Sequence, residues 1–150
     1  MFQTNNWQEA FDFVRCMKTQ DGKKSIAFVC STKNLANEKM KAAVEQLSIP
    51  SSEILVNNPK QFTTSDLALY AISLKPECLL GRKLTHIIVE ECAGDDLDKY
   101  TAIFCSGIPS CCIIVVIPDG EKSKLAKHVS LTLIENLKID GQHSSLKMKF

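Results

Sequence analysis

The chain has 150 residues, of which 45% are hydrophobic and 23% charged, the proportions of an ordinary soluble globular domain. Eighteen Lys and Arg residues against seventeen Asp and Glu give a net charge of +1, which excludes the large basic field of a strong non-specific nucleic-acid binder. A chain of this length is expected to form one domain over residues 1–150. The longest apolar run, Cys111–Ile117, is far shorter than the roughly 18–20 residues that span a bilayer, so we expect no membrane segment.

The first part of the chain predicts helix, strand, helix and strand in turn. Apolar residues at three- and four-residue steps predict a helix over Trp7–Lys18. A continuous apolar run with β-branched and aromatic members predicts a buried strand over Ser25–Cys30. The helical step returns over Asn34–Leu47, and Glu53–Val56 is expected to form the second strand.

The middle of the chain continues the alternation. Asn57–Lys60 is expected to be a loop, because Pro59 can continue neither a strand ladder nor a helix interior. A helix is expected to begin at Thr64 or Ser65 and to run to about Ile72. Thr85–Val89 is then the third predicted strand, and it stops at the paired acids Glu90 and Glu91.

The last part repeats the pattern before it becomes polar. We expect a helix over Asp95–Phe104 and a fourth strand over Cys112–Ile117, the most hydrophobic stretch of the chain, which ends at the turn residues Pro118, Asp119 and Gly120. Ser123–Asn136 is the last clear helical pattern, with room for a short strand at Leu137–Ile139. Residues 139–150 are expected to fray.

This alternation defines the expected fold class. Apolar strands separated by helical segments are typical of an α/β domain with three layers, in which helices cover both faces of a mainly parallel sheet. Ligand groups gather at the carboxyl ends of the strands in such sheets. The segments to inspect are therefore Ser31–Asn34, Asn57–Lys60, Glu90–Ala93 and Pro118–Gly120.

The cysteines and histidines argue against a metal site. Seven cysteines form no C-x-x-C pair, and most lie in or beside apolar runs, which favours buried free thiols. Such thiols indicate a reducing compartment, the cytosol or the nucleus. His86, His128 and His143 have no partners at metal-ligand spacing, so no metal is expected.

The phosphate-binding signatures are absent from the sequence. Neither G-x-x-x-x-G-K-[ST] nor G-x-G-x-x-G occurs, so a nucleoside triphosphate would have neither its nest of backbone N–H groups nor its lysine, and no cofactor is expected. Glu90 and Glu91 have two interpretations. They are either a carboxylate pair that holds Mg²⁺ through water and positions an attacking water, or two solvated acids at the end of a strand.

Four segments, in order, resemble the motifs of DEAD-box RNA helicases. Ser31–Ala36 after an apolar strand is similar to P-T-R-E-L-A, and Ile54–Gln61 resembles the strand and T-P-G-R motif that come next. Leu84–Ala93 resembles the strand that carries D-E-A-D, and Pro118–Gly120 follows an apolar strand where the family has S-A-T. The resemblance spans residues 7–139, and the order of the matches is more specific than any one of them.

The departures from this pattern shape what the resemblance implies. The phosphate loop is missing, Glu90 and Ala93 stand where the family has the first and last acids of D-E-A-D, and Pro118–Gly120 replaces S-A-T. The resemblance therefore implies a degenerate RecA-like lobe, a P-loop-like fold without the P-loop, rather than a working motor. A second helicase lobe, or the helicases whose motif is D-E-A-[GS], fits the same order. Degenerate lobes of this kind occur in the Tudor-domain helicases of small-RNA silencing.

The resemblance also implies a nucleic-acid contact. In the family, the first two motifs touch the sugar-phosphate backbone of single-stranded RNA, and hydroxyl, amide and ammonium groups suit phosphate. Gln61 stands where the family has Arg, which removes a charge and a bidentate fork. The alternative is that these polar residues only cap helices and form turns. The candidate RNA-binding residues are Ser31, Thr32, Lys33, Asn34, Asn57, Asn58 and Lys60.

Three hypotheses for function follow. The first is a non-catalytic helicase-like module, cytoplasmic or in a cytoplasmic granule, that binds single-stranded RNA weakly or a protein partner in a ribonucleoprotein assembly. The second is a nucleotide hydrolase lobe in which Glu90 and Glu91 act while a partner lobe supplies the phosphate loop. The third is a flavodoxin-like domain for protein interaction. The strand order of the sheet distinguishes the third from the others.

Overall fold

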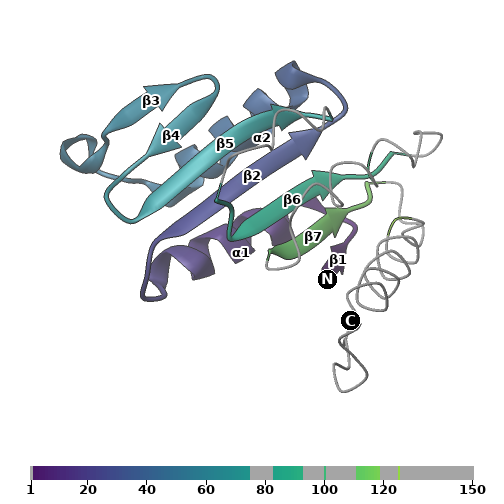
Figure 1. Ribbon diagram of the computed structural model, residues 1–150, viewed down its shortest axis with the longest axis horizontal. Coiled ribbons are helices and arrows are strands. Elements are labelled where there is room, and N and C mark those ends of the chain that lie inside the picture. The colour runs from purple at the N-terminus through teal and green to yellow at the C-terminus, as the bar shows by residue number, and fades with distance from the viewer. Residues whose placement is uncertain (1, 75–82, 93–99, 101–110, 119–124, 126–150) are drawn as a thin grey trace, which may run out of the picture.

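A single sheet organises the computed structural model (Figure 1), which describes residues 2–74, 83–92, 100, 111–118 and 125. Within these ranges, seven strands lie in the order β1-β7-β6-β2-β5-β4-β3. β1, β7, β6, β2 and β5 are parallel, and β4 and β3 extend the sheet as an antiparallel arm. The strands are β1 Phe2–Thr4, β2 Lys24–Cys30, β3 Val56–Asn58, β4 Gln61–Thr63, β5 Leu67–Ser73, β6 His86–Glu90 and β7 Cys112–Val116.

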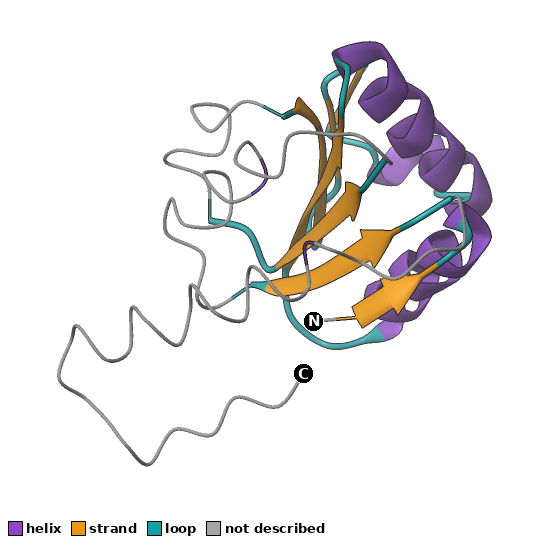
Figure 2. Ribbon diagram, turned by 90° about the vertical axis from the view of Figure 1, so that its right-hand side faces the viewer, coloured by secondary structure: helices purple, strands orange, loops and turns teal. Residues whose placement is uncertain are grey.

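Two helices cover one face of this sheet, α1 (Trp7–Thr19) and α2 (Lys33–Leu47), as Figure 2 shows. Each begins at a side-chain cap: the Asn6 side chain accepts a hydrogen bond from the Glu9 N–H, and the Thr32 hydroxyl accepts one from the Leu35 N–H. Within the described ranges, no helix is long and apolar enough to cross a membrane.

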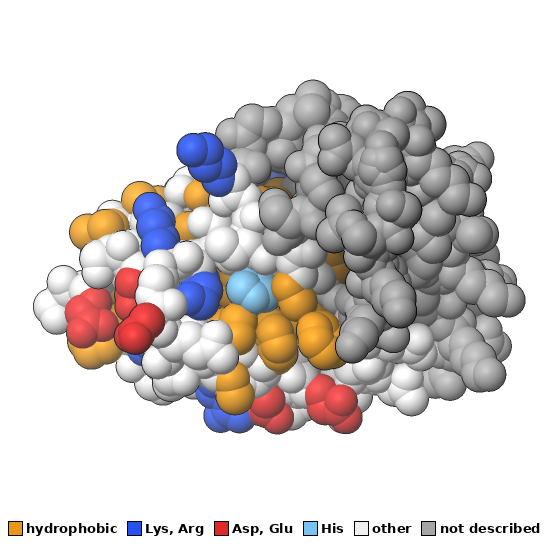
Figure 3. Space-filling model, turned by 60° about the horizontal axis from the view of Figure 1, so that its bottom comes forward, with side chains coloured by type: hydrophobic (Ala, Val, Ile, Leu, Met, Phe, Trp, Pro, Cys, Tyr) orange, Lys and Arg blue, Asp and Glu red, His pale blue; other side chains and the backbone are white. Residues whose placement is uncertain are grey.

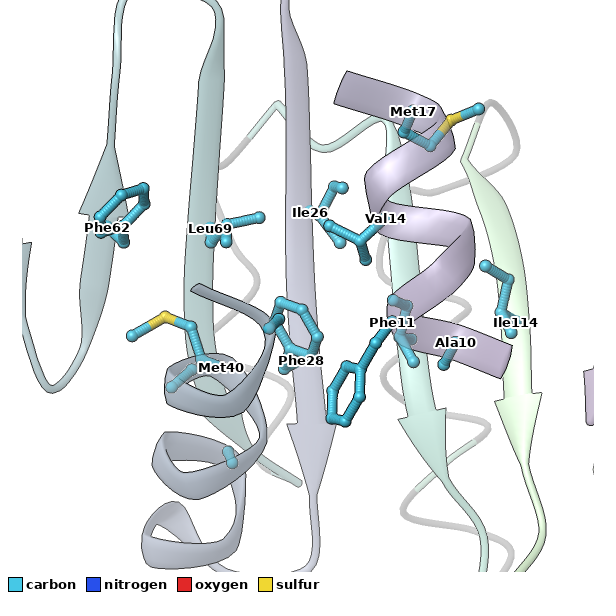
Figure 4. Packing of buried hydrophobic residues seen from close by; sticks show 14 of the residues in the cluster. Ala10, Phe11, Val14, Met17, Ile26, Phe28, Met40, Phe62, Leu69 and Ile114 are labelled. Atoms are coloured by element: carbon cyan, nitrogen blue, oxygen red, sulfur yellow. The ribbon is translucent and has the colours of Figure 1, made fainter. Parts of the chain in front are cut away.

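The core lies in two layers, one on each face of the sheet. Along β2, Ile26 and Phe28 pack against the helices while Ala27 and Val29 face the opposite side, because successive strand residues alternate. Burial on both faces explains the uninterrupted apolar sequence of β2. Figure 4 shows the helix-side layer, which includes Ala10, Phe11, Val14, Met17, Met40, Phe62, Leu69 and Ile114.

The second layer contains Tyr100 and Leu125, both in helical backbone conformation and fully buried against the other face of the sheet. The predicted α/β fold class, a mainly parallel sheet with helices, is confirmed. The helices predicted over Trp7–Lys18 and Asn34–Leu47 and the strands predicted around β2, β6 and β7 are confirmed with end shifts of a residue or so.

Two predicted elements are wrong. The segment predicted as a strand, Glu53–Val56, begins in a 3-10 turn (η1, Ser51–Glu53) and enters β3 only at Val56. The segment predicted as a helix after Thr64 is instead the strand β5. β5 is buried on both faces, so its sequence lacks the period-two alternation that would have distinguished it from a buried helix.

Other predictions lie outside the described residues. Of the helix predicted over Asp95–Phe104, the structure describes only Tyr100. Of the helix predicted over Ser123–Asn136, it describes only Leu125. The short strand at Leu137–Ile139 and the frayed tail 139–150 lie wholly outside them.

The strand order excludes one of the three hypotheses. Numbered along the chain, the five parallel strands of the described part lie in the spatial order 1-5-4-2-3. A flavodoxin-like domain has the order 2-1-3-4-5, with its first strand inside the sheet. Here the first strand, β1, lies at the sheet edge beside β7, so the flavodoxin-like hypothesis is wrong.

Candidate functional site

The carboxyl ends of the parallel strands share one edge of the sheet. β2 ends at Cys30, beside Ser73 at the end of β5, and β6 ends at Glu90, beside Val116 of β7. The predicted segment Ser31–Asn34 therefore leaves the sheet at the same edge as the acid pair. Pro118, exposed after β7, also belongs to this edge, whereas Asp119 and Gly120 lie outside the described residues.

The turn between β3 and β4 also lies at this edge, because β4 runs antiparallel to β5. Asn57 and Asn58 belong to β3 rather than to a loop, which corrects the prediction, and Pro59 and Lys60 form the turn. The Asn58 side-chain oxygen accepts from the N–H groups of Lys60 and Gln61, at 2.9 Å each. Because β4 runs antiparallel to β5, the turn returns to the carboxyl end of β5, where the Ala71 N–H donates to the Lys60 carbonyl at 3.0 Å.

Asn37 connects the two predicted segments. With its amide nitrogen toward two carbonyls, Asn37 donates to the Pro59 oxygen at 2.6 Å and to the Lys33 oxygen at 3.3 Å. The first turns of α2 are thereby attached to the β3–β4 turn. The structure thus brings Ser31–Asn34 and Asn57–Lys60 together, although residues 35–56 separate them in the chain.

The seven candidate RNA-binding residues are all exposed, and some have structural roles as well. The Thr32 hydroxyl caps α2, and the Asn58 oxygen forms the turn. This fits the alternative interpretation for those two atoms. Lys33 and Lys60 place two positive charges on the surface beside the amino-terminal end of a 15-residue helix, whose dipole is also positive at that end.

The acid pair is buried rather than solvated, which corrects the second interpretation given above. Glu90 is 7% exposed and Glu91 6%. One Glu90 carboxylate oxygen accepts from Trp7 Nε1 at 2.6 Å, and the other accepts from Cys92 Sγ at 3.5 Å. Glu91 accepts from the backbone N–H of Leu125 at 3.2 Å. Both carboxylates are thus held by protein donors.

Trp7 contacts the acid pair, which the sequence did not predict, because its spacing identified it only as an apolar residue of a helix. Its ring packs on Phe11, at 5.7 Å between centroids, and stacks on Phe28 at 6.5 Å. Lys39 of α2 lies over the ring, with Nζ 5.1 Å from the centroid. Only two residues, Asn5 and Asn6, separate β1 from Trp7 at the start of α1. In a P-loop domain a strand–turn–helix connection carries a long glycine-rich loop, so this connection is too short for such a loop.

The described cysteines are free thiols with different environments. Cys30 is buried, Cys92, Cys111 and Cys112 are half-buried, and Cys16 is exposed. Burial, helped by the negative charge of Glu90, raises the pKa of the Cys30 thiol to about 12, so this group stays protonated and unreactive at neutral pH. Among the described residues, no three His, Cys, Asp or Glu side chains are placed to hold a metal ion.

Comparison with known proteins supports the fold alone. No family model and no curated protein match the sequence. The structure is similar to the ATPase domain of the large terminase of Thermus phage P74-26, with a TM-score of 0.59 and 13% identity over 81% of this chain and 59% of that one. An arginine-to-alanine mutant of that domain gives a TM-score of 0.56 and 12% identity, over 84% of this chain and 61% of the other.

These solved domains are ATPase domains, and this chain spans less than two thirds of their length. At such identities the likeness concerns architecture, not chemistry. Together with the strand order, it shows the fold alone. The fold is a RecA-like α/β fold, a mainly parallel sheet with helices.

Proposed function

We propose that this chain is a non-catalytic, DEAD-box-like module that binds the backbone of single-stranded RNA along the edge formed by Ser31–Asn34 and Asn57–Lys60. The observation that carries the proposal is the joining of these two exposed segments through Asn37. Each segment resembles a helicase motif, and the fold that unites them is RecA-like.

The chemistry of this edge suits phosphate groups. Lys33 and Lys60 supply ammonium donors, Ser31 a hydroxyl, and Asn34 and Asn57 amides. Such groups contact the sugar-phosphate backbone and carry no information about the bases. We therefore expect binding that depends little on RNA sequence.

Affinity is expected to be modest. The net charge of the chain is only +1, so its overall attraction for phosphate groups is weak. On the face that Figure 3 shows, basic, acidic and hydrophobic side chains of the described part are interspersed, so this face has no basic field either. A second RNA-binding or protein-binding module in a larger assembly would raise the overall affinity through effective concentration. The sequence resemblance to degenerate lobes of Tudor-domain helicases favours a cytoplasmic assembly of small-RNA silencing.

The hydrolase hypothesis receives less support. Glu90 and Glu91 are occupied by Trp7, Cys92 and Leu125, and two residues connect β1 to α1. Water activation by a carboxylate requires that carboxylate to reach the water. In this arrangement the two carboxylates accept from protein donors.

Charge reversal tests the RNA site. Lys33→Glu and Lys60→Glu change the proposed edge, and Lys23→Glu is the matched control, since Lys23 is exposed in the turn before β2 at the opposite end of the strands. An exposed ion pair contributes roughly 0.2–1 kcal/mol, and reversal adds a repulsion of similar size, so each edge variant should weaken binding by about fivefold.

The measurement is fluorescence anisotropy of a labelled unstructured RNA at low salt. Lys23→Glu should bind within about twofold of the parent, because it lies far from the proposed contact. Equal weakening by all three variants would show a diffuse electrostatic attraction instead of a site. Absence of binding by the parent would end the RNA proposal and leave protein interaction as the better account.

A further inference from the structure

Trp7 connects the acidic end of β6 to α2. Its indole N–H donates to Glu90 at 2.6 Å, and Lys39 of α2 lies over its ring. The ring also stacks on Phe28 in β2, so Trp7 contacts β6, β2 and α2. These contacts join elements that are distant in sequence, since 83 positions separate Trp7 from Glu90.

The connection continues from α2 to the proposed RNA edge. Reciprocal amide hydrogen bonds join Gln8 of α1 to Gln46 of α2, at 2.8 and 3.1 Å, so the two helices are held at both Trp7 and Gln46. Asn37, two positions before Lys39 on α2, donates to the Lys33 and Pro59 carbonyls. A shift of α2 relative to Trp7 would therefore displace Lys33 and the β3–β4 turn.

We propose that Trp7 is a built-in latch that holds α2, and with it the RNA-binding edge, in its binding geometry without a bound nucleotide. This inference rests on the proposed RNA function. Lys39 is then a positioning residue, because it affects RNA binding only by holding α2 in place against Trp7. By thermodynamic reciprocity, a latch that favours RNA binding must itself be tightened when RNA binds.

The sequence provides a direct probe of this latch, because Trp7 is the single tryptophan of the chain. Its fluorescence and its collisional quenching by acrylamide report the packing of this one ring. Saturating RNA should reduce the quenching. Mg-ATP should change neither the quenching nor the RNA affinity, because the sequence has no phosphate-binding loop to hold it.

The test compares Lys39→Met with Lys41→Met. Both changes remove one positive charge from α2, and Lys41 is exposed one turn or less away. Lys39→Met should weaken RNA binding measurably more than Lys41→Met, by at most about fivefold, because the latch can shift RNA affinity by no more than the roughly 0.5–1 kcal/mol of a cation over an indole ring. It should also increase acrylamide quenching in the RNA-free protein. Lys39→Arg, which keeps a cation over the ring, should restore both properties.

The outcomes separate the latch from the RNA function. If the parent binds RNA while the two methionine variants bind equally and RNA leaves the quenching unchanged, the latch is refuted and the RNA function stands. An increase of RNA affinity on addition of Mg-ATP would also refute the latch. If the parent does not bind RNA at low salt, both proposals fail, and the failure lies in the RNA function.

Discussion

Replacing Trp7 by phenylalanine removes one hydrogen bond while keeping an aromatic ring at the start of α1. The indole N–H donates to a Glu90 carboxylate that is 7% exposed, so the variant leaves a buried carboxylate oxygen without this donor. A hydrogen bond to a charged group contributes roughly 1.5–3 kcal/mol, and the smaller ring also leaves space beside Phe28. We expect Trp7→Phe to lower the free energy of unfolding by about 2 kcal/mol.

Urea unfolding followed by far-UV circular dichroism measures this change, since the variant has no tryptophan fluorescence. The melting temperature should fall by about 4–8 °C, because 1 kcal/mol corresponds to roughly 2–4 °C in a chain of this size. Glu90→Gln serves as the second arm of a double-mutant cycle, with an expected coupling of about 1 kcal/mol. A loss below about 0.5 kcal/mol, or strict additivity with Glu90→Gln, would refute the reasoning.

Three further outcomes follow from the same edge. Calorimetry with Mg-ATP should show neither micromolar affinity nor turnover, because no anion nest is present in the sequence, and turnover that disappears in Glu91→Gln would restore the hydrolase hypothesis. Burial raises the pKa of the Cys30 thiol from 9.0 to about 12, so the folded state favours the neutral thiol more than the unfolded state does. The contribution of this group to the free energy of unfolding is full below pH 9.0 and is lost as the pH rises toward 12. Unfolding measurements across this pH range should therefore show a smaller loss of stability in Cys30→Ala than in the parent. A plot of the logarithm of the RNA binding constant against the logarithm of the salt concentration should have a slope of about −1.4, because Lys33 and Lys60 each neutralise one phosphate and each phosphate contributes about −0.7. A slope near zero would contradict phosphate contact.

Several elements were predictable from sequence because their signals are local. α1 and α2 repeat apolar residues at helical steps, and β2, β6 and β7 are short continuous apolar runs. The order of such segments determines a parallel sheet covered by helices, since each strand must bury both faces. The positions of Ser31–Asn34 and Glu90 at strand ends follow from the same signals.

The antiparallel arm was decided by the tertiary structure. The apolar residues of β5 fit either a buried helix or a buried strand, and only pairing with β2 and β4 selects the strand. The short strand β3 is exposed and has no periodic signal of its own. Pro59 marks the turn after it, but the pairing of β3 with β4 that gives β3 its place is not encoded in a local pattern.

The burial of Glu90 and Glu91 was likewise decided by the tertiary structure. The sequence determined that Glu90 and Glu91 end an apolar strand, and it left two interpretations, a pair that holds Mg²⁺ through water or two solvated acids, neither of which includes the burial that the structure shows. Burial and donors decide the chemistry of a carboxylate, and here the donors include an indole 83 positions away. That contact exists only because β1 lies beside β7 and the start of α1 lies near the end of β6, and such a meeting of distant segments depends on the packing of the whole sheet.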